Sequence, residues 1–212
     1  MYEEWKPVFT ALACDIMDKM GHREQAMDSG VRPAQEGQQV AGRALTLDAH
    51  ATTEDNEDPY GQIFEAYDHM QPSDVVVIAT NGEQRSGLWG GLLSTAAQAR
   101  SVHAVVTDGL VRDVREMNDM GFVCFSRGYS PLDSHGRCLP TAVNVPIQCG
   151  GVSITPGDLI LADIEGVVAI PQGIGAQVLR LSLEKLEGES TVRRELEAGD
   201  SPRVVFDRYG IL

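Results

Sequence analysis

Sequence motifs that mark common cofactors are absent from this chain of 212 residues. Neither Gly-x-Gly-x-x-Gly nor a Walker loop occurs among the 22 glycines, which argues against dinucleotide and nucleoside triphosphate cofactors. There is no Gly-x-Ser-x-Gly nucleophile elbow, and the five histidines show no spacing that is typical of a zinc site. Any catalytic chemistry must therefore come from another arrangement of residues.

Basic residues and long apolar runs are also scarce. The chain has 17 lysines and arginines and 31 acidic residues, which gives a formal net charge of -14. Such a surface repels phosphate backbones and anionic membranes, so nucleic acid is not expected as a direct partner. The first residues lack the apolar core of a signal peptide, and no apolar run has the length needed to span a bilayer. We therefore expect no membrane partner and a soluble, cytoplasmic protein.

Four cysteines are scattered without a Cys-x-x-Cys pair. Cys124, Cys138 and Cys149 fall in apolar stretches typical of strands, and with Cys14 they are predicted to be buried, reduced thiols. The length, the 42% apolar content and the 23% charged content are ordinary for one globular domain, which we place at residues 1–212.

Hydrophobic spacing divides the chain into alternating helices and strands. Helices are predicted at residues 7–20, 60–70, 113–120 and 176–198, with another opened by Gly90-Gly91. Strands are predicted at residues 40–49, 75–79, 103–107 and 122–126, and loops at 81–87 and 108–112. Breaks at glycine and proline between residues 139 and 170 are typical of antiparallel strands. The sequence thus predicts an α/β fold with a parallel sheet, a second antiparallel sheet and outer helices.

The apolar strand at residues 103–107 leads to Arg112 and Asp113, an arginine and a carboxylate side by side. Arginine offers a planar fork that matches carboxylates. One aspartate is the sparse ligation that Mg²⁺ accepts when water and substrate oxygens fill the rest of its shell. The pair therefore suits an anionic, metal-held substrate. A second interpretation remains open, in which Asp113 only N-caps the next helix and Arg112 is a solvated charge.

Gly90 and Gly91 open a helix whose first N–H groups, those of Gly91, Leu92 and Leu93, lack helical partners. Such an N-terminus binds carboxylates, and the glycines would let a ligand approach the backbone. The alternative is that the glycines only permit tight packing of the helix against the sheet.

Together the two segments resemble the RraA-like family, and the resemblance runs along nearly the whole chain. It includes VAGRA at residues 40–44, PSDVVV at 72–77, GGV at 150–152, TPGD at 155–158, and Asp163. Each motif alone is a weak indication. In this order and spacing they are specific to the family, although not to one substrate.

The resemblance implies a swivelling β/β/α fold and a divalent-metal lyase. Catalytic members cleave 4-hydroxy-4-methyl-2-oxoglutarate and decarboxylate oxaloacetate, and both reactions pass through the pyruvate enolate. By resemblance, Asp113 holds Mg²⁺ or Mn²⁺, while Arg112 and the backbone of Gly90, Gly91, Leu92 and Leu93 bind the carboxylate of a 2-oxo acid. Only retro-aldol cleavage also requires a base for the substrate hydroxyl. The resemblance further implies a homotrimer or hexamer with sites between subunits.

The chain departs from the aldolase pattern at Gly91, where characterised aldolases carry an acid that orients water on the metal. We therefore expect oxaloacetate decarboxylation to exceed aldol cleavage. In the family, a glutamate from the C-terminal helix of a neighbouring subunit also reaches the site. Glu189 matches that position best and Glu187 lies close to it, with a solvated helix charge as the alternative for Glu189.

A polar loop after a predicted strand contains Asp133, His135 and Arg137, and functional residues concentrate in such loops. His135 is a candidate acid or base near neutral pH, although a loop histidine is more often structural.

Two other functions compete with the lyase. The member that gives the family its name is a non-catalytic protein that binds and inhibits an RNA-degrading endonuclease. That regulator lacks the Arg-Asp pair, which this chain retains as Arg112-Asp113, so the lyase is favoured. A menaquinone-pathway methyltransferase is not supported, because no glycine-rich methyl-donor motif follows a strand.

Overall fold

Four parallel strands form the centre of the largest sheet. The computed structural model describes residues 3–211, so residues 1, 2 and 212 of the predicted domain lie outside the described residues. The strands β7 (Val123–Ser126), β5 (Ala104–Thr107), β3 (Asp74–Ala79) and β2 (Val40–Ala51) pair in parallel in that order. All residues of β3 and β5 are buried, as in strands that are covered on both faces. The predicted parallel core is confirmed.

The length of β2 lets it pair with two different strands along one edge. Its first residues pair antiparallel with β12 (Leu159–Asp163), and its last residues pair antiparallel with β9 (Cys138–Val143), with a bulge at Asp48/Ala49 within this pairing. Beyond β12 lies β13 (Gly166–Ile170), and β1 (Arg32–Pro33) pairs with β7 at the other edge.

The antiparallel strands therefore join the parallel sheet, where the sequence indicated a sheet of their own. Among residues 3–211, only β10 (Ile147–Cys149) and β11 (Val152–Ile154) form a separate antiparallel sheet. The 12 residues of β2 explain the difference, because so long an edge carries N–H and C=O groups that β12 and β9 satisfy. The mixed α/β class itself is confirmed.

A small parallel sheet, which the sequence did not indicate, places two key segments side by side. It consists of β4 (Gly87–Trp89), β6 (Leu110–Val111) and β8 (Gly128–Tyr129). Strands of two or three residues are too short to show a period, so β6 was expected to be part of a loop. Since Trp89 pairs with Val111, the ends of β4 and β6 meet, directly before Gly90 and Arg112.

The predicted helices are confirmed, with shifts at their ends that are ordinary for such boundaries. Their bounds are α1 (Thr10–Lys19), α2 (Gly61–His69), α3 (Gly91–Ala99), α4 (Val114–Asp119) and α5 (Gly175–Glu197). The helix α6 (Pro202–Tyr209) and the 3-10 helices η1 (Glu3–Trp5) and η2 (Gln172–Ile174) were not predicted.

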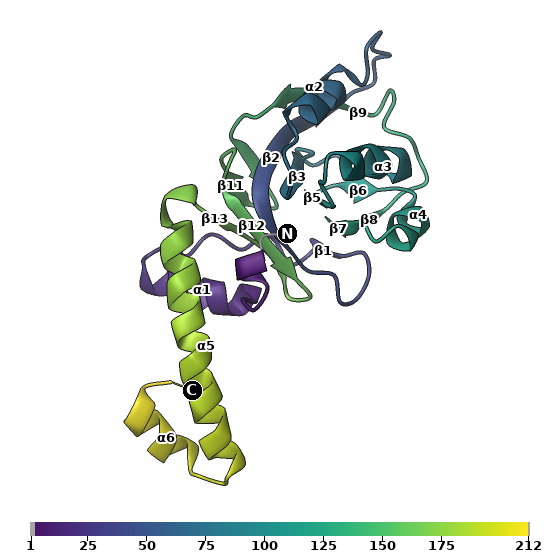
Figure 1. Ribbon diagram of the computed structural model, residues 1–212. Helices are drawn as coiled ribbons and strands as arrows, with labels where there is room; N and C mark the ends of the chain where they lie inside the picture. The colour runs from purple at the N-terminus through teal and green to yellow at the C-terminus, as the bar shows by residue number, and fades with distance from the viewer. Residues whose placement is uncertain (1–2, 212) are drawn as a thin grey trace.

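The helices cover different parts of the sheet (Figure 1). The helices α3 and α4 lie together beside the small sheet, where Trp89 and Phe122 are stacked in a buried cluster. The helix α1 packs with the start of α5 against β12 and β13, through Leu12, Met17 and Val178. The rest of α5 extends away from the sheet and carries α6 at its far end. No helix in the part of the chain that the structure describes is long and apolar enough to cross a membrane.

All four cysteines are free thiols. Cys124, Cys138 and Cys149 are buried as predicted, whereas Cys14 is only partly buried. Burial raises the pKa of Cys124 and of Cys138 to about 12, so both stay protonated near neutral pH. A protonated thiol is a poor nucleophile and a poor metal ligand, so these two residues have a structural role.

The β2–β3 contact provides a test of the fold. A Cβ at Gly42 would collide with the carbonyl oxygen of Ser73 and lie 2.9 Å from Val75 Cγ2. We expect Gly42→Ala to lower the free energy of unfolding by about 1–3 kcal/mol, because the backbone of a buried sheet must shift. Gly173→Ala is the control, since no atom lies within 4 Å of its Cβ position. Chemical denaturation measures both variants, and equal losses would contradict the expectation.

Candidate functional site

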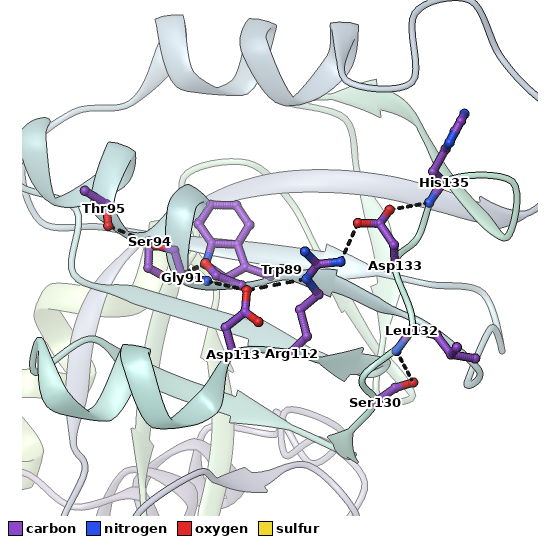
Figure 2. A network of polar contacts seen from close by, with 11 residues as sticks. Trp89, Gly91, Ser94, Thr95, Arg112, Asp113, Ser130, Leu132, Asp133 and His135 are labelled. Atoms are coloured by element: carbon purple, nitrogen blue, oxygen red, sulfur yellow. Dashed lines mark hydrogen bonds and ion pairs between the residues drawn. The ribbon is translucent and has the colours of Figure 1, made fainter.

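The ends of β4 and β6 open into a cavity of about 320 Å³. It is lined by Gly90, Leu92 and Leu93 at the start of α3 and by Arg112 and Asp113 after β6. Figure 2 shows Arg112 between the two carboxylates of Asp113 and Asp133. The further lining residues are Tyr60, Phe64, Gly87, Leu88, Trp89, Asp133 and Ser134. The structure thus brings together the predicted site residues of the two sequence segments.

Asp113 occupies the N-cap position of α4, but its carboxylate makes no capping hydrogen bond to that helix. Its backbone is left-handed, with φ of 53°, a conformation that aspartate tolerates better than most residues. The side chain points instead to α3, where its Oδ2 accepts a hydrogen bond of 3.2 Å from the Gly91 N–H. Asp113 therefore links the start of α3 to the start of α4.

Gly90 makes room for this contact. A Cβ at Gly90 would lie 2.6 Å from Asp113 Oδ2 and 2.9 Å from Arg112 Cγ. Of the three N–H groups that open α3, the one of Gly91 is bonded to Asp113, and those of Leu92 and Leu93 have no partner among residues 3–211. These two N–H groups are available to an anion in the cavity.

Arg112 is held from two sides. Its Nε donates to Asp113 Oδ2 at 3.4 Å, and its Nη1 donates to Asp133 Oδ2. Although partial burial lowers the pKa of the guanidinium, the charges of Asp133 and Asp113 outweigh this effect and raise it. Among the described residues, Nη2 has no partner. Arg112 is thus a fixed positive charge with one free edge, and not a solvated surface charge.

The predicted polar loop supplies Asp133 to this arrangement. The His135 backbone N–H donates to Asp133 Oδ1 at 2.8 Å and lowers the pKa of the carboxyl, an effect that partial burial opposes and Arg112 reinforces. Arg137 Nη1 donates to the Asp133 carbonyl oxygen at 3.0 Å and so fixes the loop. The half-exposed ring of His135 lies 3.9 Å from Asp55 and is not part of the cavity lining.

The Asp113 carboxylate is suited to coordinate Mg²⁺. Among residues 3–211, both hydrogen bonds to its carboxylate end at Oδ2, so Oδ1 has no partner there, and the side chain is 40% exposed. Within residues 3–211 there is no group of three or more His, Cys, Asp or Glu that could hold a metal. A closed zinc site is therefore not formed by these residues, whereas one carboxylate suits Mg²⁺ or Mn²⁺ that retains water and substrate ligands.

Glu189 does not reach this cavity within its own chain. It lies on α5, where its carboxylate pairs with Lys185 Nζ at 3.4 Å, and Figure 1 shows that α5 runs away from α3 and α4. Glu187, the neighbouring candidate, is exposed. The expectation that Glu189 of a neighbouring subunit completes the site remains a prediction.

Sequence reasoning missed the aromatic wall that α2 contributes. The rings of Tyr60 and Phe64 lie 6.3 Å apart and line the cavity, and 61% of Phe64 is exposed. Their spacing of four residues, on one face of a helix, was a usable indication. Trp89 was also missed; its Nε1 donates to Ser94 Oγ at 2.9 Å and ties β4 to α3.

Comparisons with known proteins agree with this geometry. The sequence profile of the RraA-like family, described as Aldolase/RraA, matches residues 10–169. A protein of Halalkalibacterium halodurans named "Putative 4-hydroxy-4-methyl-2-oxoglutarate aldolase" is 30% identical over 193 residues, which cover 91% of this chain and 87% of the relative. The 4-hydroxy-4-methyl-2-oxoglutarate aldolase of Thermus thermophilus is 30% identical over 100 residues, 46% of this chain and 59% of that protein.

A solved structure extends the likeness to the fold. Streptomyces coelicolor RraAS2, described as an unusual member of the RNase ES inhibitor RraA protein family, superimposes with a TM-score of 0.83 at 27% identity. The match covers 91% of this chain and 96% of that one. The chain belongs to the RraA-like family, and the predictions of family and fold class are both confirmed.

The contact between Arg112 and Asp133 can be tested by the titration of the Asp133 carboxyl. The His135 N–H and, after it, Arg112 make the pKa of Asp133 lower in the folded than in the unfolded chain, so these contacts stabilise the fold above the ordinary aspartate pKa of about 3.9. That contribution is lost as the pH falls through the folded-state pKa, and exposure keeps it below about 1 kcal/mol. We expect Arg112→Met to raise the titration midpoint of the Asp133 carboxyl carbon in NMR. An unchanged midpoint would show that the pair does not form in solution.

Proposed function

We propose that this protein is a divalent-metal-dependent lyase that cleaves carbon–carbon bonds of 2-oxo acids and releases pyruvate. Oxaloacetate decarboxylation and retro-aldol cleavage of 4-hydroxy-4-methyl-2-oxoglutarate are the candidate reactions. The observation that carries the proposal is one cavity lined by Asp113, Arg112, Leu92 and Leu93. Among residues 3–211, Asp113 Oδ1, Arg112 Nη2 and the Leu92 and Leu93 N–H groups have no hydrogen-bond partner. The aldolase names of the two relatives support the same reaction class.

Each residue of the cavity has a distinct role in binding the substrate and the metal. The Leu92 and Leu93 N–H groups and Arg112 Nη2 donate hydrogen bonds to the carboxylate of the 2-oxo acid, at the positive end of the α3 dipole. Asp113 Oδ1 would hold the divalent cation. Asp133 and Asp113 fix the Arg112 side chain before the substrate arrives, so the substrate does not have to order it.

The bound Mg²⁺ or Mn²⁺ would supply Lewis-acid stabilisation of the negative charge that develops on the substrate carbonyl oxygen. The protein contributes orientation and partial exclusion of water. The apolar side chains of Tyr60, Phe64 and Leu92 form the wall beside the polar groups, where the part of the substrate beyond the pyruvyl unit would lie.

A ribonuclease-inhibiting role, which the description of the Streptomyces relative names, would not require these groups. An inhibitor surface has no need for a guanidinium fixed by two carboxylates beside unpaired N–H groups. We therefore favour the lyase. The direct test is pyruvate release from a panel of 2-oxo acids with magnesium and with a chelator. The lyase proposal is overturned if no member of the panel yields pyruvate in either condition.

The metal ligand can be tested by Asp113→Asn. We expect this change to remove magnesium-dependent pyruvate release and to weaken Mn²⁺ binding by at least about 100-fold, because residues 3–211 contain no cluster of three or more metal-ligating side chains that could hold the ion without Asp113. Asp68→Asn is the matched control, since Asp68 lies on α2 with a side chain that is 79% exposed. Wild-type activity in Asp113→Asn would remove Asp113 from the mechanism.

The geometry of the carboxylate clamp can be tested by Arg112→Lys. Lysine keeps the positive charge but cannot contact Asp113, Asp133 and a substrate carboxylate through one planar group. Loss of a charged hydrogen bond corresponds to a reduction of kcat/KM of about 10- to 100-fold. Steady-state kinetics with oxaloacetate give the value. Equal kcat/KM in the variant and the wild type would mean that Arg112 acts only as a charge.

A further inference from the structure

A second carboxylate lies against the glycine pair, on a residue that is not part of the cavity lining. Glu116 is on α4, one helical turn after Asp113, and its side chain is exposed. Within residues 3–211, no hydrogen bond or ion pair engages its carboxylate. The carboxylate nevertheless lies directly against the backbone of α3, at Gly91.

The missing side chain of Gly91 provides the space for this carboxylate. A Cβ at Gly91 would collide with Glu116 Oε2 and lie 2.5 Å from the carboxylate carbon and 3.1 Å from Oε1. An aspartate at position 91 would hold its own carboxylate one bond beyond that Cβ. Glu116 therefore fills, from α4, the space that an acidic side chain at position 91 would fill from α3.

The two carboxylates of α4 flank the glycine pair. Asp113 Oδ2 lies against Gly90 and accepts the Gly91 N–H, and Glu116 lies against Gly91. Arg112 contacts Asp113 and Asp133 but not Glu116 among its described partners, so it does not neutralise the second carboxylate directly. Asp113 Oδ1 and the Glu116 carboxylate both lack a hydrogen-bond partner among the described residues. Magnesium is commonly bound through one or two carboxylates, so this pair is a suitable environment for a divalent cation.

We propose that Glu116 is a positioning residue that replaces the acid absent from position 91. It accepts hydrogen bonds from the hydration water of a divalent cation held by Asp113 Oδ1. The inference rests on the proposed function, because it takes a cation on Asp113 as given. It also changes the expectation drawn from Gly91, since the site keeps a second acid despite the glycine.

The test combines removal and transfer of the carboxylate, with Mn²⁺ affinity measured by electron paramagnetic resonance of the free ion. Glu116→Gln keeps the shape of the side chain and removes its charge. The double variant Gly91→Asp with Glu116→Ala moves the carboxylate to α3, where the space is then vacant. Asp119→Asn is the control, because it makes the same chemical change on the same helix at a side chain that is 75% exposed. Pyruvate release from oxaloacetate is a second, separate measurement.

We expect Glu116→Gln and Glu116→Ala to weaken Mn²⁺ binding by about 10-fold or more, as outer-shell partners of metals do. Asp119→Asn should bind Mn²⁺ like the wild type, and the double variant should bind it more tightly than Glu116→Ala alone. Wild-type affinity in Glu116→Gln, or a double variant no tighter than Glu116→Ala, overturns the proposal.

The two measurements separate this inference from the proposed function. If Glu116→Gln weakens Mn²⁺ binding and the wild type releases no pyruvate, Glu116 has the assigned position and the lyase reaction is wrong. If the wild type releases pyruvate with metal and Glu116→Gln binds Mn²⁺ normally, the lyase stands and the role of Glu116 is wrong. Absence of Mn²⁺ binding in the wild type overturns both.

Discussion

The hydrogen bond from the Gly91 N–H to the Asp113 carboxylate is the contact on which the candidate site depends. It joins the first residue of α3 to the residue that precedes α4, across the pairing of β4 with β6. The bond fixes Oδ2 of Asp113 and leaves Oδ1 available to coordinate a cation. It also requires Gly90, because any Cβ there would press on the same carboxylate. The glycine pair is thus explained by the position of side chains and not only by helix packing.

The distribution of charge follows from this arrangement. One guanidinium, that of Arg112, faces the carboxylates of Asp113 and Asp133, with Glu116 close behind, in a chain with 31 acidic and 17 basic residues. An anionic substrate that enters such a site meets more negative than positive charge. A divalent cation would offset that excess of negative charge, which is the physical reason why the proposed reaction depends on metal. The N–H groups of α3 then add partial positive charge that needs no counter-ion.

Much of this arrangement could be predicted from the sequence. The helices and longer strands show clear periods, and the adjacent Arg112 and Asp113 after a strand indicated the site directly. The strands β4 and β6 could not be predicted, because two or three residues carry no period. The contact of Arg112 with Asp133 also depends on loop geometry across 21 positions. Glu116 could be placed on the same helix as Asp113 by spacing, but its contact with Gly91 follows only from the pairing of β4 with β6.

The central claim is that Asp113, Arg112 and the start of α3 together hold a metal and a 2-oxo acid. Oxalate resembles the planar pyruvate enolate, so a crystal structure with Mn²⁺ and oxalate tests this claim most directly. The account predicts an anomalous manganese peak at Asp113 Oδ1, with oxalate bound to the metal, to Arg112 and to the N–H groups of Leu92 and Leu93. Manganese and oxalate bound elsewhere, with Asp113 free of metal, would contradict it.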